Sequence, residues 1–202
     1  MNNDAPCVNV VDDDALVLRS LGRLLKSAGF DVRTFPSPQD FLAQKRDDQP
    51  GCLVLDLSMP GVNGLQLQAQ LAGSGNDYPV VFLSGNAEIL HSVQAMKAGA
   101  VDFLTKPVDR EKLLAAVRIA IGRDQSARIE RDERESIAAR VASLTARERE
   151  VLEGVVTGKL NKQIAAELGT AEKTVKVHRA RVMKKMRAGS LAELVLLARR
   201  LR

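Results

Sequence analysis

The chain has 202 residues, of which 45% are hydrophobic and 27% are charged, a composition that suits packed domains and excludes a disordered chain. No apolar run approaches the roughly 20 residues that a membrane-spanning helix needs, so no membrane partner is expected. Residues 1–6 lack a basic stretch followed by a small-residue cleavage site, which argues against a secretory signal. Cys7 and Cys52 lie in apolar segments without a CxxC or His-rich neighbour, which favours buried reduced thiols and a cytoplasmic location.

The net charge of +5 is divided unevenly along the chain. Residues 1–124 hold 12 Lys and Arg against 15 Asp and Glu, a net of −3, whereas residues 125–202 hold 18 against 10, a net of +8. An acidic half joined to a basic half suggests a regulatory unit followed by a polyanion-binding unit. Charged surface residues that bind no partner could give the same totals, so the motifs must show whether the basic half binds a polyanion.

Short apolar segments alternate five times with amphipathic ones over residues 7–122, which predicts a parallel sheet with helices on both faces. The predicted strands are 7–11, 31–35, 52–55, 79–83 and 101–104. The predicted helices are 14–28, 38–45, 65–71, 87–98 and a further helix from about 109. Asp14 and Ser37 are expected to cap the first two helices, and Pro38 suits the first helical position of the second.

Polar side chains follow the ends of these strands, at the edge where open α/β sheets bind ligands. Three carboxylates gathered there would repel one another unless a cation such as Mg²⁺ neutralised them. Asp56 could then act as a nucleophile toward phosphorus, with an ammonium and a hydroxyl nearby. Each residue alone has an ordinary explanation as a cap, turn or loop residue, but their joint placement favours a site. They are Asp12, Asp13, Asp56, Ser84 and Lys106.

The segments VVDDD, LVLDLSMPGVNG, VFLSGNAE and MKAGAVDFLTKP resemble, in this order, the receiver domains of two-component response regulators. The resemblance implies a flavodoxin-like (βα)5 fold with strand order 2-1-3-4-5 and a cis Lys106–Pro107 bond. It also implies that Asp56 accepts a phosphoryl group from a histidine kinase. The implied Mg²⁺ ligands are Asp13, Asp56 and the backbone carbonyl of Ser58, with Asp12 acting through water, and the implied phosphoryl contacts are Ser84 and Lys106.

Phe103 matches the switch aromatic of this family, and ordinary core packing is the alternative interpretation. In the switch account, the Ser84 hydroxyl moves toward the phosphate and vacates space for the ring, and the face formed by residues 87–105 then dimerises. Two positions depart from the family pattern. Val108 stands where Phe is common, and Asn86 lies in SGNAE, which replaces a commoner Thr-Gly-His-Gly-Asp, beside the expected path of the attacking water.

The second half of the chain is predicted to be entirely helical. Residues 123–142 are highly charged and predict a solvated helical linker, since the sustained heptads of a coiled coil are missing. Capping-box patterns beginning at Thr145 and Ser190 mark two helix starts. Between them, NKQIAAEL and AEKTVKVHRARVMKKM flank a Gly-Thr break, which is typical of a helix-turn-helix. The predicted organisation is a domain at 1–122, the linker, and a four-helix domain at 143–202.

The segment from Leu144 to Met186 resembles the LuxR/NarL-type helix-turn-helix, and both halves together resemble FixJ-like response regulators. Basic residues on the second helix of this motif suit the major groove and its phosphates, although a basic surface helix without a partner is the alternative. The resemblance places Lys176 and Val177 at base edges. It places Lys162, Lys173 and Thr174 near the DNA backbone and Arg179 or Arg181 as further base contacts. His178 is assigned to packing or a phosphate, and Lys184, Lys185 and Arg187 extend the cationic reach.

The combined prediction is a transcription regulator whose receiver is phosphorylated on Asp56, dimerises, and thereby controls binding to double-stranded promoter DNA. Its expected partners are a histidine kinase, a second copy of the chain and RNA polymerase, with Mg²⁺ as cofactor. No enzymatic activity is expected beyond self-phosphorylation from a phosphodonor and slow autodephosphorylation. A phosphohydrolase would need a second carboxylate two residues after Asp56, where Ser58 stands. A DNA-binding protein with a purely structural receiver is the other alternative, which the intact set of pocket residues disfavours.

Overall fold

The computed structural model describes residues 5–45, 49–73, 78–85 and 89–200, and the chain divides into two compact units at 128/129. Each unit has a hydrophobic core of its own. Helix α5 (Arg110–Ala142) contributes residues to both units, so the predicted linker is the continuation of a helix that begins in the first one. Within the described ranges, no helix combines the length and apolar character needed to cross a membrane.

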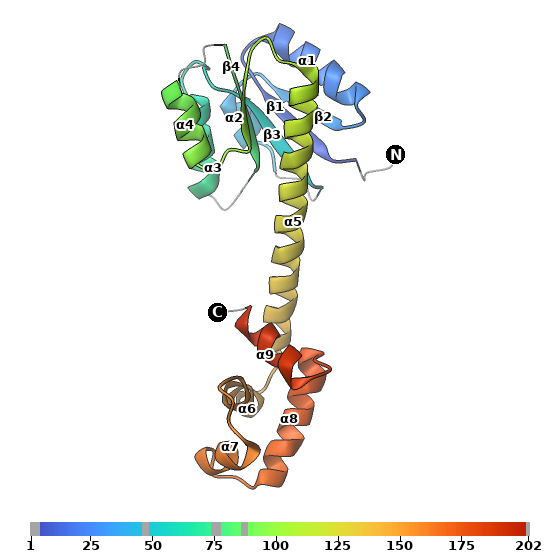
Figure 1. The fold of residues 1–202 in the computed structure, drawn as a ribbon, viewed down its shortest axis with the longest axis vertical. Helices are drawn as coiled ribbons and strands as arrows, with labels where there is room; N and C mark the ends of the chain where they lie inside the picture. Colours follow the sequence, from blue (N-terminus) through green and yellow to red (C-terminus); the bar gives the residue numbers. More distant parts are fainter. Residues whose placement is uncertain (1–4, 46–48, 74–77, 86–88, 201–202) are drawn as a thin grey trace. The chain divides into compact units, whose positions relative to one another are not determined.

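The first unit is built on a five-stranded parallel sheet with the order β2-β1-β3-β4-β5, which confirms the expected flavodoxin-like fold (Figure 1). The three inner strands β1, β3 and β4 are buried along their whole length, because helices cover both faces of the sheet, whereas the edge strands β2 and β5 are partly exposed. Cys7 and Cys52 are both buried, as expected. The strands are β1 (Cys7–Val11), β2 (Asp31–Phe35), β3 (Gly51–Asp56), β4 (Val80–Ser84) and β5 (Asp102–Thr105).

Two layers of helices enclose this sheet. Helices α1 and α5 pack on one face around Val10 and Val117, and α2, α3 and α4 pack on the other around Leu55 and Phe82. The caps predicted for the first two helices are present: the side chains of Asp14 and Ser37 accept hydrogen bonds from the backbone N–H groups of Leu16 and Asp40. The helices are α1 (Ala15–Ser27), α2 (Pro38–Leu42), α3 (Gly64–Gly73) and α4 (Ile89–Lys97).

The register of the strands brings the polar strand-end residues to one edge of the sheet. Val11 pairs with Leu55, and Ser84 pairs with Thr105, so each of these strands ends at a similar level. The residues that follow, Asp12 and Lys106, therefore emerge beside Asp56 and Ser84.

Gly64 begins α3 directly behind Asp56. A Cβ atom at this position would lie 2.5 Å from the Asp56 carbonyl oxygen and 2.9 Å from the Phe82 ring. We expect Gly64→Ala to lower the free energy of unfolding by about 1–3 kcal/mol, because the backbone of β3 must move. Gly122→Ala is the matched control, since its Cβ would meet no atom within 4 Å and Ala is the better helix former. Thermal unfolding measured by circular dichroism checks both, and a Gly64→Ala chain as stable as wild type would contradict this packing.

The second unit contains four helices after α5, in agreement with the predicted four-helix domain. Thr145 forms a reciprocal capping box with Glu148, and the Ser190 side chain caps the last helix, as expected. A turn containing Gly169, with φ of +59°, joins the two central helices. The helices are α6 (Ala146–Val156), α7 (Asn161–Glu167), α8 (Glu172–Met186) and α9 (Leu191–Arg199). Their core includes Ile137, Val151, Ile164, Val175, Val182, Met186 and Leu194.

Candidate functional site

A lysine ammonium bridges two buried carboxylates at the carboxyl edge of the sheet. The Nζ atom of Lys106 lies 2.6 Å from Asp12 Oδ2 and 2.6 Å from Asp56 Oδ1. The remaining carboxylate oxygens accept backbone hydrogen bonds: Asp12 Oδ1 from the N–H of Asp14 (2.9 Å) and Asp56 Oδ2 from the N–H of Ser58 (2.8 Å). Both carboxylates are thus held in fixed orientations at the ends of β1 and β3.

This edge carries more buried negative charge than a single ammonium compensates. Asp12 and Asp56 are 1% and 4% exposed. Burial raises the pKa of Asp12, even though its hydrogen bond to Lys106 lowers it. Burial alone would lower the pKa of Lys106, but its bonds to Asp12 and Asp56 outweigh this effect and raise it. The arrangement therefore favours the binding of an additional cation.

The other predicted pocket residues lie around this pair. Ser84 is fully buried at the end of β4, and its carbonyl oxygen accepts a hydrogen bond from the N–H of Lys106 (2.8 Å). Asp13 and Ser58 are exposed on the two loops that follow β1 and β3. The Lys106–Pro107 peptide bond is cis, as expected from the resemblance. Asn86 lies outside the described residues.

Phe103 is half-buried on β5, and its ring centroid lies 6.3 Å from that of Phe82. It packs against the core beneath α2, α3 and α4. This contact is compatible with both the switch and the core interpretation of Phe103. Val108, the departure after Lys-Pro, packs against the core on the other face, beneath α1 and α5.

A divalent cation was predicted to bind beside Asp56. Among the described side chains, no group of three or more His, Cys, Asp or Glu residues lies close enough together to hold a metal ion. Lys106 stands between Asp12 and Asp56, and Asp13 is exposed. The available donors are nevertheless hard oxygens, the type that Mg²⁺ prefers, and two buried carboxylates share one ammonium there. The residues present therefore fit Mg²⁺.

Helix α8 carries most of the predicted DNA contacts, and most of them are exposed. Lys176 extends from the helix and, within the described part of the chain, forms an ion pair with Glu172 at 3.2 Å. Val177 is 45% exposed, so it belongs to the surface of α8 and not to its core. Arg179 is half-buried and donates a hydrogen bond to Asn161 Oδ1 at 2.9 Å, which ties α8 to the start of α7. The other exposed members of the predicted set are Lys162, Lys173, Thr174 and Arg181.

Lys185 does not extend outward as expected. Its Nζ atom lies 2.6 Å from Glu148 Oε2 and 3.0 Å from the carbonyl oxygen of Ser143. Glu148 is 3% exposed and also accepts the backbone N–H of Thr145 at 2.9 Å. Lys185 therefore joins α8 to the start of α6, and the capping-box pattern gave no indication of this partner.

Glu148 should make the stability of the second unit depend on pH. Hydrogen bonds from Lys185 and from the backbone of Thr145 lower the pKa of Glu148 from 4.5 to about 2. Its stabilising contribution is therefore fully present above about pH 4.5 and is lost as the pH falls toward about 2. We expect Glu148→Gln to lower the melting temperature at pH 7, and we expect the difference from wild type to shrink below pH 4.5.

Calorimetric unfolding of the full chain between pH 7 and pH 2.5 checks this expectation. Glu150→Gln is the matched control, because it removes a carboxylate from an exposed pair with Arg147 and should change the melting temperature little at any pH. A constant difference between Glu148→Gln and wild type down to the lowest pH would contradict the proposed ionisation.

Two family models match the chain. Residues 8–118 match the model described as response regulator receiver domain, which includes the pocket around Asp56. Residues 142–198 match the model described as bacterial regulatory proteins, luxR family, which includes α6, α7 and α8. The two matches fall on the two halves that differ in charge and in fold.

Similar proteins match along nearly their whole length. The chain is 42% identical over 202 residues to response regulator protein TmoT of Ectopseudomonas mendocina, covering 100% of this chain and 92% of the relative. It is 43% identical over 193 residues to transcriptional regulatory protein FixJ of Bradyrhizobium diazoefficiens, covering 96% and 94%. A solved structure of response regulator StyR is 45% identical, with a TM-score of 0.87, covering 96% of this chain and 98% of that one.

Proposed function

Because the chain belongs to the response regulators and combines a receiver domain with a LuxR-type DNA-binding domain, we propose that phosphorylation of Asp56 controls its binding to promoter DNA. The observation that carries the proposal is the buried Asp56 carboxylate, held by Lys106 and by the N–H of Ser58 at the carboxyl edge of the sheet. The chain is thus a regulator and not a turnover enzyme. The proposed domains are a receiver at 1–122, a helical linker at 123–142 and a DNA-binding domain at 143–202.

Asp56 is the proposed phosphoacceptor. One carboxylate oxygen forms a bond to phosphorus while the bond between phosphorus and the histidine nitrogen of the kinase breaks, and the imidazole leaves. The Lys106 ammonium, which now bridges Asp12 and Asp56, would pair with a phosphoryl oxygen, and the Ser84 hydroxyl would donate to another. The residue two positions after Asp56 is Ser58. Without a carboxylate there, the proposed reactions are limited to phosphorylation from a phosphodonor and slow autodephosphorylation.

Mg²⁺ is the proposed cofactor of this site. Asp13, Asp56 and the backbone carbonyl of Ser58 would hold it, with Asp12 acting through water. When bound, the ion neutralises charge on the carboxylates and the phosphoryl oxygens. Two buried carboxylates share the ammonium of Lys106, which supports a role for this second positive charge.

Dimerisation through α4 is the proposed consequence of phosphorylation. Movement of Ser84 toward the phosphoryl group would open space for the ring of Phe103, as a ligand shifts a two-state equilibrium. Three apolar side chains on α4 are exposed, which supports an interface there: Leu90 at 74%, Val93 at 44% and Met96 at 47%.

The proposed DNA contacts centre on α8, with Lys176 and Val177 facing base edges in the major groove. Arg181 is exposed for a further base contact, whereas Arg179 would have to release Asn161 to make one. Lys162, Lys173 and Thr174 would contact the backbone. A cytoplasmic location, a cognate histidine kinase and RNA polymerase as a partner complete the proposal.

The proposal is tested with beryllofluoride, which mimics the phosphoryl group, on the full chain. Size-exclusion chromatography and a gel-shift assay on DNA selected from a random library are run with and without beryllofluoride and Mg²⁺. We expect wild type to dimerise and to bind DNA at least tenfold more tightly only when both are present. Asp56→Asn should lose the response, whereas the control Asp31→Asn, on the exposed start of β2, should keep it. A Mg²⁺-independent response, or an unchanged response in Asp56→Asn, would overturn the proposal.

A further inference from the structure

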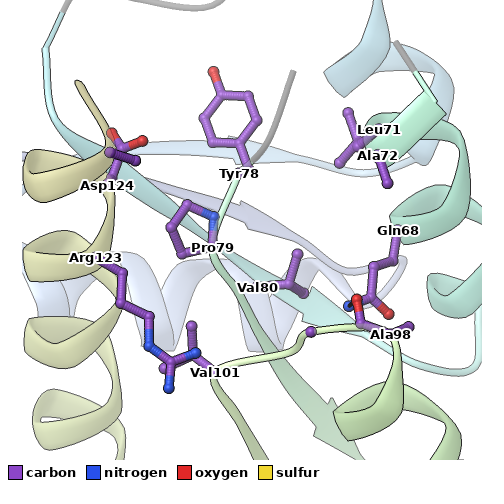
Figure 2. A pocket seen from close by; sticks show the side chains of 12 residues that line it. Gln68, Leu71, Ala72, Tyr78, Pro79, Val80, Ala98, Val101, Arg123 and Asp124 are labelled. Carbon is purple, nitrogen blue, oxygen red and sulfur yellow. Dashed lines mark hydrogen bonds between the residues drawn. The ribbon is translucent and has the colours of Figure 1, made fainter. Parts of the chain in front are cut away.

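A cavity of about 300 Å³ lies at the opposite edge of the receiver sheet, beside the amino ends of β4 and β5 (Figure 2). Leu71, Val80 and Val101 give it an apolar lining and are themselves at least nine-tenths buried. Its two side walls come from α3 and α5. A volume of this size suits a small organic molecule, and apolar walls with a few placed polar groups are typical of ligand sites.

The α3 wall holds a buried hydrogen-bond acceptor without a donor. Gln68 is 6% exposed, and its Nε2 atom donates to the Ala98 carbonyl oxygen at 3.1 Å, which fixes the orientation of the amide. Its Oε1 atom is buried and has no hydrogen-bond partner among the described residues. Buried amide oxygens are nearly always paired, so this atom indicates a missing donor.

The α5 wall holds a guanidinium without a counter-charge. The side chain of Arg123 runs from α5 toward Val101, across the cavity from Gln68 (Figure 2). No carboxylate of the described residues forms an ion pair with it. Its neighbour Asp124 is engaged elsewhere: it accepts from the N–H of Gly51 at 2.9 Å and from Nε of Arg128 at 2.8 Å.

Both walls are fixed in place without a ligand. The buried bond from Gly51 to Asp124 attaches α5 to the start of β3, and the bond from Gln68 to Ala98 attaches α3 to the segment before β5. The walls of the cavity are therefore held by bonds within the protein, and a ligand donor would need only a local shift of the side chains that cover Gln68 Oε1.

We propose that this cavity binds a small carboxylate with an apolar body and a hydrogen-bond donor at its other end. The carboxylate pairs with Arg123, the apolar body covers Val80 and Val101, and the donor satisfies Gln68 Oε1. A guanidinium matches a carboxylate in planar, bidentate geometry, which makes a carboxylate the anion of choice. The site is separate from the phosphorylation pocket and does not depend on the function proposed for Asp56.

The test uses 4-hydroxybenzoate as the probe, with the isotope-labelled full chain observed by NMR. Benzoate lacks the donor, and 4-hydroxybenzyl alcohol lacks the carboxylate. We expect saturable shifts of the backbone amides of residues 98–101 and 123–127, with each truncated probe binding at least fivefold more weakly. Arg123→Gln should weaken 4-hydroxybenzoate at least tenfold. Arg118→Gln, an exposed arginine earlier on α5, should leave binding unchanged.

Gln68→Leu separates the donor contact from general packing. In this variant, 4-hydroxybenzoate should lose its advantage over benzoate. Arg123→Gln alters an exposed side chain and still tests the site if Gln68→Leu does not fold. The proposal is overturned if wild type shows no saturable shifts, which would mean that the cavity holds water only. It is also overturned if Arg123→Gln and Arg118→Gln bind the probe equally well.

Discussion

Replacing Lys106 with Met should destabilise the receiver by about 3 kcal/mol, because removing one partner from a buried charge cluster leaves uncompensated charge behind. The ammonium is the cation that contacts both Asp12 and Asp56, at 2.6 Å each, and these carboxylates are 1% and 4% exposed. The pKa of Asp12 is already raised with Lys106 in place. Without Lys106, two anionic carboxylates would face each other at the ends of neighbouring strands.

Mg²⁺ should restore most of the stability that Lys106→Met loses. An ion that binds only the folded state stabilises it by about 2.7 kcal/mol when present at one hundred times its dissociation constant. The variant should therefore show a larger rise in melting temperature with Mg²⁺ than wild type does. It should still fail to respond to beryllofluoride, since the ammonium that is proposed to pair with the phosphoryl group is gone.

Thermal unfolding with and without Mg²⁺ measures both effects. Lys112→Met is the matched control, because Lys112 is exposed on the first turn of α5, and its removal should change neither quantity. A Lys106→Met chain that melts at the wild-type temperature without Mg²⁺ would show that the two carboxylates do not need this cation.

The residues of the proposed phosphorylation pocket could be brought together from sequence because each stands at the end of a predicted strand or directly after one. In a parallel sheet, the residues after consecutive strands meet at one edge whatever the details of packing, so Asp12, Asp56 and Lys106 had to converge. The geometry of the ion pairs between these residues could not be predicted from the sequence. The sequence places Lys106 near the carboxylates, but only the structure shows one ammonium shared between Asp12 and Asp56.

The directions of the basic side chains on α8 could not be predicted in the same way. Helical periodicity identifies the buried stripe of Val175, Val182 and Met186, but a long flexible side chain beside that stripe can turn either way. Lys185 turns inward to pair with Glu148. This partner lies 37 positions earlier in the sequence, so the local pattern of α8 could not indicate it. Arg179 pairs with Asn161, which lies 18 positions earlier, so the local sequence pattern could not predict this partner either.

Lys176 is exposed, whereas Lys185 is paired with Glu148, so we expect substitutions of these two lysines to have different effects on DNA binding. Lys176→Ala should weaken binding to selected DNA about 5- to 150-fold, the range expected when one base contact worth about 1–3 kcal/mol is lost. The folded state should be unaffected, because Lys176 is 63% exposed and its pair with Glu172 is a surface ion pair. The melting temperature of the variant should therefore match that of wild type.

Lys185→Ala is the matched comparison, since it removes the same charge from the same helix. Its ammonium stabilises the buried Glu148 carboxylate, so this variant should melt at a lower temperature and bind DNA normally wherever it remains folded. Gel shifts across a salt series separate the roles further. If Lys176 contacts only a phosphate, its loss reduces the salt slope by about one and weakens all sequences alike. If it contacts a base, the loss of affinity is concentrated on the selected sequence. Equal affinities of wild type and Lys176→Ala for the selected DNA would contradict the prediction and would place the recognition surface elsewhere on α8.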